Sequence, residues 1–281
     1  MTGGGAPADA GSLGALRGFA FELDGCIWAG PILLPGAAEV VAALREAGRH
    51  VVFVTNSSRE RSATLADRLG RMGIVTPAAD VLSALELLGE AIRRQVGPVP
   101  VLALGSDELV AVLEAAGHTV VPPAAWERAR AVAVGNDPAF DFARLRGAAR
   151  AVAAGAAFFT VNLDPRLPVG PDEFDPGCGA LAEAVAVAGG ARPVVIGKPH
   201  RPIFDMALEQ LGCRPAEAAM VGDSLATDVA GGHAAGMFTV WLDPDRTRDG
   251  AGEPRAGLTV RSLVELRDRW RRACEGRRPS A

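Results

Sequence analysis

Two carboxylates, Glu22 and Asp24, follow directly on an apolar stretch that begins at Gly18. In a β-strand the side chains of residues i and i+2 point the same way, so we expect these acids to converge on one spot while Leu23 faces the opposite layer. Converging acids can bind a metal ion or transfer a proton, and Gly25 lets the chain turn sharply beside them. A solvated strand end is the alternative interpretation of an isolated acidic pair.

Polar clusters also follow three later apolar runs that we interpret as strands. They are Thr55, Asn56 and Ser57 after residues 50–54, Lys198 after residues 193–196, and Asp223 with Asp228 after residues 218–221. In a doubly wound parallel sheet the carboxyl ends of the strands face one crevice, so we expect all these clusters to meet there. For each cluster taken alone, a helix cap or a surface charge is the alternative.

This mixture of side chains is typical of phosphoryl transfer. Carboxylates hold Mg²⁺, which binds phosphate oxygens, while a hydroxyl, backbone amides and an ammonium group hold the remaining oxygens as charge shifts during the reaction. One carboxylate can attack phosphorus and a second can protonate the leaving oxygen. The sequence contains no GxxxxGK[ST] segment, which excludes a P-loop nucleotide site.

Lys198 stands out by composition. It is the single lysine among 29 basic residues, so the preference for arginine elsewhere did not act at this position. A compact ammonium group on a flexible stem differs physically from a planar guanidinium group. We therefore expect Lys198 to belong to a site, with chance survival of one lysine as the alternative.

Strand and helix patterns alternate along most of the chain, which predicts an α/β fold with parallel sheets. After the first strand, the predicted strands are 50–54, 99–104, 130–134, 156–160, 193–196, 218–221 and 238–242, and the predicted helices are 37–47, 59–72, 84–95, 107–116, 140–153, 203–211, 227–235 and 261–273. The last third resumes the pattern of the first, so the predicted domains are a discontinuous core of residues 17–82 and 190–274 and an inserted domain of residues 83–189. Residues 1–16 are expected to form a disordered tail and residues 275–281 a flexible one, and residues 164–179 have the turn chemistry of a long functional loop.

Composition argues against several classes of protein. The net charge of −4 gives no general affinity for nucleic acid or for an anionic membrane. The cysteines are scattered without CxxC spacing, which indicates neither a zinc site nor a disulfide framework and fits a reducing compartment. We find no export signal and no run long enough to span a bilayer, so we expect a cytoplasmic protein.

In their order and spacing, the clusters resemble the four motifs of the haloacid dehalogenase (HAD) superfamily of phosphatases. Glu22-Leu23-Asp24-Gly25 is similar to the first motif, Thr55-Asn56 to the second, Gly197-Lys198-Pro199 to the third, and residues 222–228 to the fourth. The insert between the second and third motifs has about the size of the large α/β cap of subfamily IIA, which contains NagD-like sugar phosphatases, 4-nitrophenylphosphatases, and pyridoxal and glycerol phosphate phosphatases. The resemblance implies a Rossmann-like parallel-sheet core with an inserted α/β cap domain.

The resemblance also implies catalytic and metal-binding roles. Glu22 stands at the position of the nucleophile and can also bind a metal ion. Asp24 would act as general acid and then as general base, with its main-chain carbonyl oxygen on Mg²⁺. Asp223 would bind Mg²⁺ directly, and Asp228 would lie on the metal side or behind a ligand.

The remaining matches imply a phosphate-binding set. Thr55, Asn56 and Lys198 would hold the phosphate of a small phosphorylated metabolite, with Ser57 near it. Caps of this branch often mediate dimers, so a homodimer through the cap is expected.

The sequence departs from the family pattern at two places. The family has aspartate where this chain has Glu22, and a displacement of ~1 Å can cost on the order of 10²-fold in rate. Three interpretations follow: a working phosphatase whose backbone has shifted to accommodate Glu22, a catalytically silent protein that binds a phosphorylated metabolite or a partner, and a regulatory subunit without a ligand. Relatives that act on pyridoxal phosphate carry an aromatic residue and a histidine where Arg166 and Leu167 stand here, so that substrate is less expected; Arg166 is interpreted either as a contact to a second anionic group or as an exposed loop charge.

Overall fold

The computed structural model describes residues 13–168, 173–245 and 255–276. The chain divides into two compact units. Unit 1 contains Met1–Thr55, Ala66–Leu82 and Phe204–Ala281, and unit 2 contains Asn56–Leu65 and Ser83–Ile203.

Unit 1 is built on a six-stranded sheet with the order β15-β14-β13-β1-β4-β5. The pairs from β15 to β4 are parallel, so their carboxyl ends lie at one edge of the sheet. The strands are β1 (Gly18–Phe21), β4 (His50–Thr55), β5 (Val81–Ser83), β13 (Ala218–Gly222), β14 (Phe238–Leu242) and β15 (Leu258–Val260). The short strands β2 (Trp28–Ala29) and β3 (Ile32–Leu33) form a separate hairpin.

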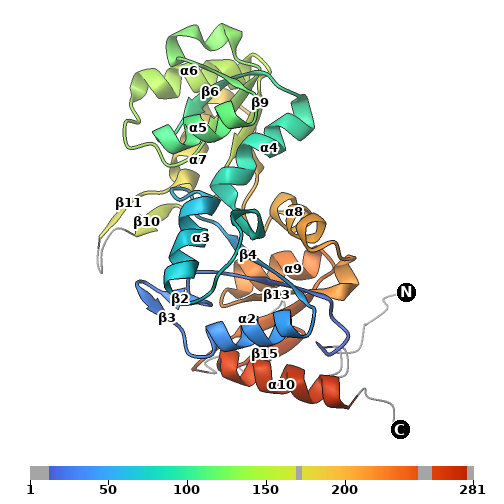
Figure 1. Ribbon diagram of the computed structural model, residues 1–281. Helices are drawn as coiled ribbons and strands as arrows, with labels where there is room; N and C mark the ends of the chain where they lie inside the picture. The colour runs from blue at the N-terminus through green and yellow to red at the C-terminus, as the bar shows by residue number, and fades with distance from the viewer. Residues whose placement is uncertain (1–12, 169–172, 246–254, 277–281) are drawn as a thin grey trace. The chain divides into compact units, whose positions relative to one another are not determined.

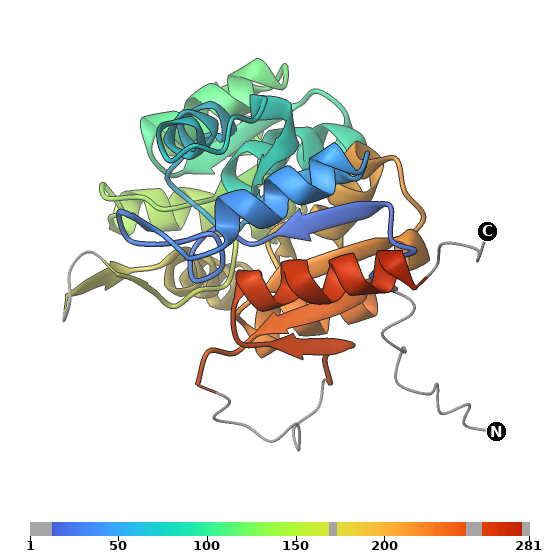
Figure 2. The same cartoon turned by 60° about the horizontal axis from the view of Figure 1, so that its bottom comes forward.

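Helices cover both faces of the unit 1 sheet. Helices α2 (Ala37–Glu46) and α10 (Leu263–Glu275) pack side by side, as both ribbon views show (Figure 1, Figure 2). Helix α9 (Ala230–Ala234) packs on β13 and β14, where a Cβ on Gly232 would lie 2.9 Å from Met220 Cβ. Since Met220 is in register with Ala20, alternation places the buried rings of Phe19 and Phe21 on the face opposite α9.

The other helical segments of unit 1 are short or cross its boundary. Helices α3 (Ser62–Arg71) and α8 (Arg201–Leu211) each begin in unit 2 and end in unit 1. The 3₁₀ helices η1 (Ala78–Asp80) and η3 (Pro215–Glu217) precede strands, and the single π-helical turn η4 (Leu225–Val229) leads into α9. Helix α10 begins after Ser262, whose hydroxyl oxygen accepts the Glu265 N–H at 3.2 Å.

Unit 2 contains a five-stranded parallel sheet with the order β12-β9-β8-β6-β7. Its strands are β6 (Pro100–Leu104), β7 (Thr119–Val121), β8 (Ala131–Val134), β9 (Ala157–Thr160) and β12 (Val194–Val195). Its helices are α4 (Ala84–Val96), α5 (Asp107–Ala115), the 3₁₀ helix η2 (Pro123–Arg128), α6 (Phe142–Ala153) and α7 (Cys178–Gly189). Helices α6 and α7 pack together over a core that includes Val132, Val134, Phe158 and Val185.

The α/β class with parallel sheets agrees with the sequence, but the strand predicted at residues 193–196 does not continue the sheet of the first strands. Within the described chain, β12 pairs with β9 through Val194 with Phe159 and Val195 with Thr160, so it belongs to unit 2. An apolar run predicts a strand but carries no information about its partner. Lys198 therefore follows a strand of unit 2, and the expectation that it follows a strand of the same sheet as β1 is wrong.

Two other expectations are corrected in part. Residues 13–16 do not belong to a disordered tail, because Leu13 and Leu16 are buried. Residues 164–179, predicted to be a long functional loop, contain a hairpin of β10 (Arg166–Pro168) and β11 (Phe174–Pro176). Residues 1–12 and 277–281 of the predicted tails and residues 169–172 of the predicted loop lie outside the described residues.

Candidate active site

The acidic segment after β1 leaves the strand geometry at once. Glu22 still donates its N–H to the Val221 carbonyl oxygen at 2.9 Å, which extends the pairing of β1 with β13. The Glu22 side chain is buried at 7 % exposure, whereas Asp24 is exposed. Glu22 and Asp24 therefore do not share a strand, because β1 ends at Phe21 and the chain bends at Leu23, and their convergence on one spot stays a prediction.

The turn after Glu22 is organised around the carbonyl oxygen of Leu23. This oxygen accepts the N–H groups of Ile27 at 2.8 Å and Trp28 at 3.0 Å, while the Gly25 N–H donates to the Trp28 carbonyl oxygen at 2.8 Å. Gly25 has a φ of +80°, and a Cβ on it would lie 2.0 Å from Asp223 Oδ2. Glycine is therefore required here, both by the positive φ and by the lack of space for a Cβ. The Asp223 carboxylate lies against the backbone of the turn that carries Asp24.

Trp28 fixes the carboxylate of Asp24. Its indole Nε1–H donates to Asp24 Oδ1 at 2.8 Å, and its ring is fully buried. The guanidinium carbon of Arg68 lies 4.1 Å from the centre of the Trp28 ring, which is a cation–π contact. Trp28 was not among the predicted site residues, although an indole four residues after an acid within a turn can indicate such a contact.

The loop after β13 carries Asp223 at the surface and Asp228 in the interior. Asp228 is 1 % exposed, and its Oδ2 accepts the Ser224 N–H at 3.1 Å. A Cβ on Gly222 would lie 2.1 Å from Asp228 Oδ2, so this glycine makes room for the carboxylate. Asp228 thus holds the loop that carries Asp223. This position agrees with the expectation that Asp228 lies behind a metal ligand. The Asp223 carbonyl oxygen is in turn held by the Trp241 indole N–H at 2.9 Å.

Negative charge gathers beneath this turn. Burial, followed by the nearby charges of Asp228 and Asp223, raises the pKa of the Cys26 thiol well above its ordinary value. Two loops far apart in the sequence therefore bring their carboxylates to one place in unit 1, beside the carboxyl ends of β1 and β13. The neighbouring strand β4 ends there at Thr55, which is 2 % exposed.

The donor atoms of this region fit a magnesium ion in part. Among the described residues, no group of three or more histidine, cysteine, aspartate or glutamate side chains is arranged to hold a metal ion. Mg²⁺ needs only one or two protein carboxylates, since it keeps several waters and binds substrate phosphate. Asp223, whose carboxylate lies against the Gly25 backbone, would supply one such carboxylate. The predicted ligands Glu22, Asp24, Asp223 and Asp228 stay a prediction.

In unit 2, Asn56 and Lys198 are joined directly. Asn56 Nδ2 donates to the Lys198 carbonyl oxygen at 3.0 Å, and Asn56 Oδ1 accepts the Lys198 N–H at 2.7 Å. The Lys198 side chain is 4 % exposed. The structure therefore shows the Asn56 side chain holding the backbone of Lys198, and a contact of Asn56 with phosphate stays a prediction.

Ser57 makes the hydrogen bonds of a local turn. Its hydroxyl oxygen accepts the N–H of Glu60 at 3.1 Å and that of Arg59 at 3.5 Å. Serine hydroxyls often stabilise turns in this way. The helix α3 begins only at Ser62, so Ser57 stabilises a turn and does not cap that helix, and a role near phosphate stays a prediction.

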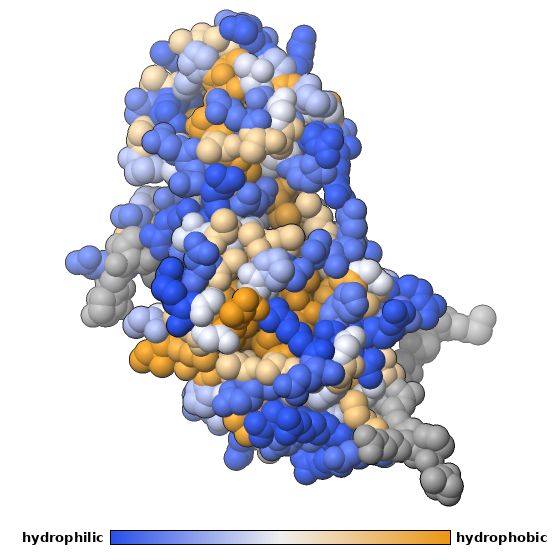
Figure 3. Space-filling view, viewed as in Figure 1, coloured by the Kyte–Doolittle hydropathy of each residue, from blue (hydrophilic) through white to orange (hydrophobic). Residues whose placement is uncertain are grey.

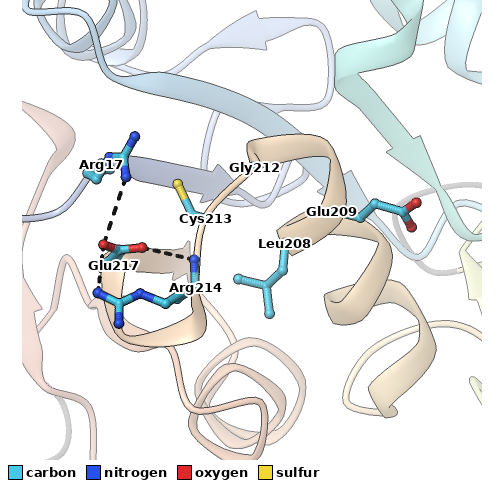
Figure 4. A pocket seen from close by; sticks show the side chains of 7 residues that line it. All are labelled: Arg17, Leu208, Glu209, Gly212, Cys213, Arg214 and Glu217. Atoms are coloured by element: carbon cyan, nitrogen blue, oxygen red, sulfur yellow. Dashed lines mark hydrogen bonds and ion pairs between the residues drawn. The ribbon is translucent and has the colours of Figure 1, made fainter.

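A cavity of about 570 Å³ lies at the other end of the unit 1 strands (Figure 4). It is lined by Arg17, which precedes β1, and by Glu217, which precedes β13, so it lies at their amino ends. Glu217 accepts a hydrogen bond from the Arg214 guanidinium at 3.0 Å and lies 3.9 Å from that of Arg17. Arg17, Arg214 and Glu217 are therefore paired with one another, and the cavity is not the predicted site.

No helix within the described ranges has both the length and the apolar character needed to cross a bilayer. The space-filling view shows hydrophilic residues over much of one face, with apolar residues among them (Figure 3).

Comparison with known proteins identifies the family. The model for haloacid dehalogenase-like hydrolases matches residues 19–119, and a second HAD-like hydrolase model matches residues 195–266. Human chronophin is 38 % identical over 240 residues, which cover 81 % of each chain. Human glycerol-3-phosphate phosphatase is 36 % identical over 246 residues, covering 78 % of this chain and 76 % of that protein.

A solved structure agrees with these relatives. The p-nitrophenyl phosphatase from Archaeoglobus fulgidus superimposes with a TM-score of 0.82 at 28 % identity, covering 90 % of this chain and 98 % of that one. The order of motifs, the α/β fold and these comparisons agree. The chain belongs to the haloacid dehalogenase-like hydrolases, in the branch of phosphatases that includes the NagD-like and 4-nitrophenyl phosphatases.

Proposed function

We propose that this chain hydrolyses a small phosphomonoester of the sugar or polyol phosphate type in a Mg²⁺-dependent reaction. The observation that carries the proposal is the contact of the Asp223 carboxylate with the Gly25 backbone, because it places two acidic loops together at the carboxyl ends of parallel strands. The similarity to glycerol-3-phosphate phosphatase supports a polyol phosphate as substrate.

In this proposal Asp24 moves the proton. Its Oδ1 accepts the Trp28 indole N–H at 2.8 Å, so the proton would reside on the other oxygen, Oδ2. A Glu22 oxygen would form a bond to phosphorus as the bond from phosphorus to the leaving oxygen breaks, and Asp24 would give its proton to that oxygen. Asp24 would then take a proton from the water that attacks the phosphoryl group, which releases phosphate and regenerates both acids.

Charge neutralisation comes from Mg²⁺ and Lys198. When bound, Mg²⁺ would neutralise phosphate oxygens, held by the Asp24 carbonyl oxygen and the Asp223 carboxylate, with Asp228 behind them. Lys198 would hold the remaining oxygens through its ammonium group, with Thr55 as a hydroxyl donor.

We propose a slow enzyme because of Glu22. The N–H of Glu22 is hydrogen-bonded to Val221 at 2.9 Å, in continuity with the register of Phe21 with Val221, so the backbone keeps its place in the sheet. The additional methylene of glutamate must then displace the carboxylate from the position that an aspartate carboxylate would take, which slows the attack on phosphorus. A protein that binds a phosphorylated metabolite without turning it over is the alternative outcome of the test below.

The test measures Mg²⁺-dependent phosphate release from glycerol 3-phosphate, hexose phosphates, pyridoxal phosphate and 4-nitrophenyl phosphate. We expect wild type to release phosphate from the polyol or sugar phosphates and Asp24→Asn to lose this activity. Asp67→Asn, the same chemical change at an exposed position of α3, is the matched control and should retain activity. No release from any compound by folded wild type would contradict the proposal. A homodimer through unit 2 and a cytoplasmic location stay predictions.

A further inference from the structure

A buried asparagine, Asn162, follows β9 in unit 2. Its side chain is 3 % exposed and has both of its polar atoms engaged. Asn162 Nδ2 donates to the carbonyl oxygen of Asn56 at 2.9 Å, and Asn162 Oδ1 accepts the Asp164 N–H at 3.1 Å. The Thr160 hydroxyl donates to the Asn162 carbonyl oxygen at 3.1 Å. Asn162 is thus fixed through both its side chain and its backbone.

Asn56 continues this chain of hydrogen bonds to Lys198. The Asn56 amide group bonds to both the N–H and the C=O of Lys198, at 2.7 Å and 3.0 Å, as a neighbouring strand would. Gly197 donates to the Val161 carbonyl oxygen at 2.7 Å. A Cβ on Gly197 would lie 2.7 Å from Asn56 Oδ1 and 2.9 Å from the Val161 carbonyl oxygen, so the chain can approach this closely only with glycine.

Three segments that are far apart in the sequence meet in this network. Asn162 bridges 106 positions to Asn56, and Asn56 bridges 142 positions to Lys198. The backbone of Lys198 therefore has its place set by side chains, in a segment where β12 has already ended. A lysine side chain is a long and flexible stem, so an ammonium group is placed precisely only if its backbone is fixed.

We propose that Asn162 is a positioning residue for Lys198 and acts through Asn56. The inference rests on the proposed function, in which Lys198 binds the phosphate of the substrate. Asn162 touches no reacting atom; it holds the carbonyl group of Asn56, whose side chain holds both peptide groups of Lys198. The segment around Asp164 is bonded to the same asparagine, so its conformation is coupled to the place of the phosphate-binding lysine.

The test separates positioning from a merely structural role by asking whether Asn162 and Lys198 act on the same quantity. The KM for 4-nitrophenyl phosphate and the inhibition constant for inorganic phosphate are measured for Asn162→Ala, Lys198→Ala and the double variant, with the thermal midpoint of each. We expect Asn162→Ala to raise both constants about tenfold, and the double variant to show no rise beyond that of Lys198→Ala, since the lost interaction is the same. Additive effects of the two changes would overturn the inference.

Two further variants keep the test decisive. Asn162→Asp has the same shape and still accepts the Asp164 N–H, but it cannot donate a hydrogen bond to Asn56. It should therefore raise both constants as the alanine variant does. It replaces the alanine variant in the test if that variant does not fold. Full phosphate affinity in Asn162→Asp would overturn the inference. Asn136→Ala, the same truncation in the loop after the adjacent strand β8, is the matched control. An unchanged inhibition constant for phosphate in Lys198→Ala would instead contradict the proposed site. If phosphate affinity falls in Lys198→Ala but not in the Asn162 variants, the proposed function stands and the role of Asn162 is overturned.

Discussion

Shortening Glu22 to aspartate should make this enzyme faster. The backbone at Glu22 is held by the hydrogen bond of its N–H to Val221 at 2.9 Å, and the side chain is buried at 7 % exposure, so neither the chain nor the carboxylate can move away easily. One methylene moves the attacking oxygen by ~1 Å, which costs on the order of 10²-fold in rate. This corresponds to about 2.7 kcal/mol in the activation free energy. Glu22→Asp should therefore raise kcat by about 10²-fold.

The assay is steady-state phosphate release under saturating substrate and Mg²⁺, with the thermal midpoint measured in parallel. Removing one buried methylene should lower the free energy of unfolding by only about 0.8 kcal/mol, so the variant stays folded. Glu39→Asp, the same change at an exposed position of α2, should alter neither quantity. If folded Glu22→Asp is no faster than wild type, the reasoning from side-chain length is refuted.

Three more expectations concern the turn and the metal. Gly25→Ala places a Cβ 2.0 Å from Asp223 Oδ2 at a φ of +80°, so it should lower kcat by at least about 10²-fold, and lower the free energy of unfolding by about 1–2 kcal/mol in a denaturant titration. Trp28→Phe removes the 2.8 Å hydrogen bond to Asp24 and should lower kcat about tenfold, or about 1.4 kcal/mol, while a steady kcat would show that this bond does not orient the acid. Chelation with EDTA should abolish phosphate release and added Mg²⁺ should restore it; release that persists after exhaustive chelation would exclude the proposed role of the ion.

Much of the fold follows from local patterns in the sequence. Alternating apolar runs and helical periods predict the α/β class and most elements, because each pattern depends on residues close together in the chain. The polar residues after β1, β4 and β13 were found in the same way, and these strands are indeed neighbours in one sheet. The pairing of strands does not follow from local patterns. The apolar run at residues 193–196 predicts a strand equally well in either sheet, and only long-range contacts place β12 beside β9.

The site shows the same limit at the level of side chains. The alternation rule predicted that Glu22 and Asp24 point together, but β1 ends at Phe21, three residues before Asp24, so the rule does not apply there. The contacts of Trp28 with Asp24 and of Asn162 with Asn56 depend on turns whose geometry is not periodic. Residue type alone does not reveal that a buried indole or amide holds a functional side chain in place.

The central claim is that the Glu22 carboxylate attacks phosphorus. It is tested most directly by mixing wild type with excess 4-nitrophenyl phosphate and Mg²⁺, quenching in acid during turnover, and mapping phosphorylated peptides by mass spectrometry. We expect a phosphoryl group on Glu22 in wild type and none in Glu22→Gln, which should also be inactive. Turnover by Glu22→Gln at the wild-type rate, or a phosphoryl group on another residue, would contradict it.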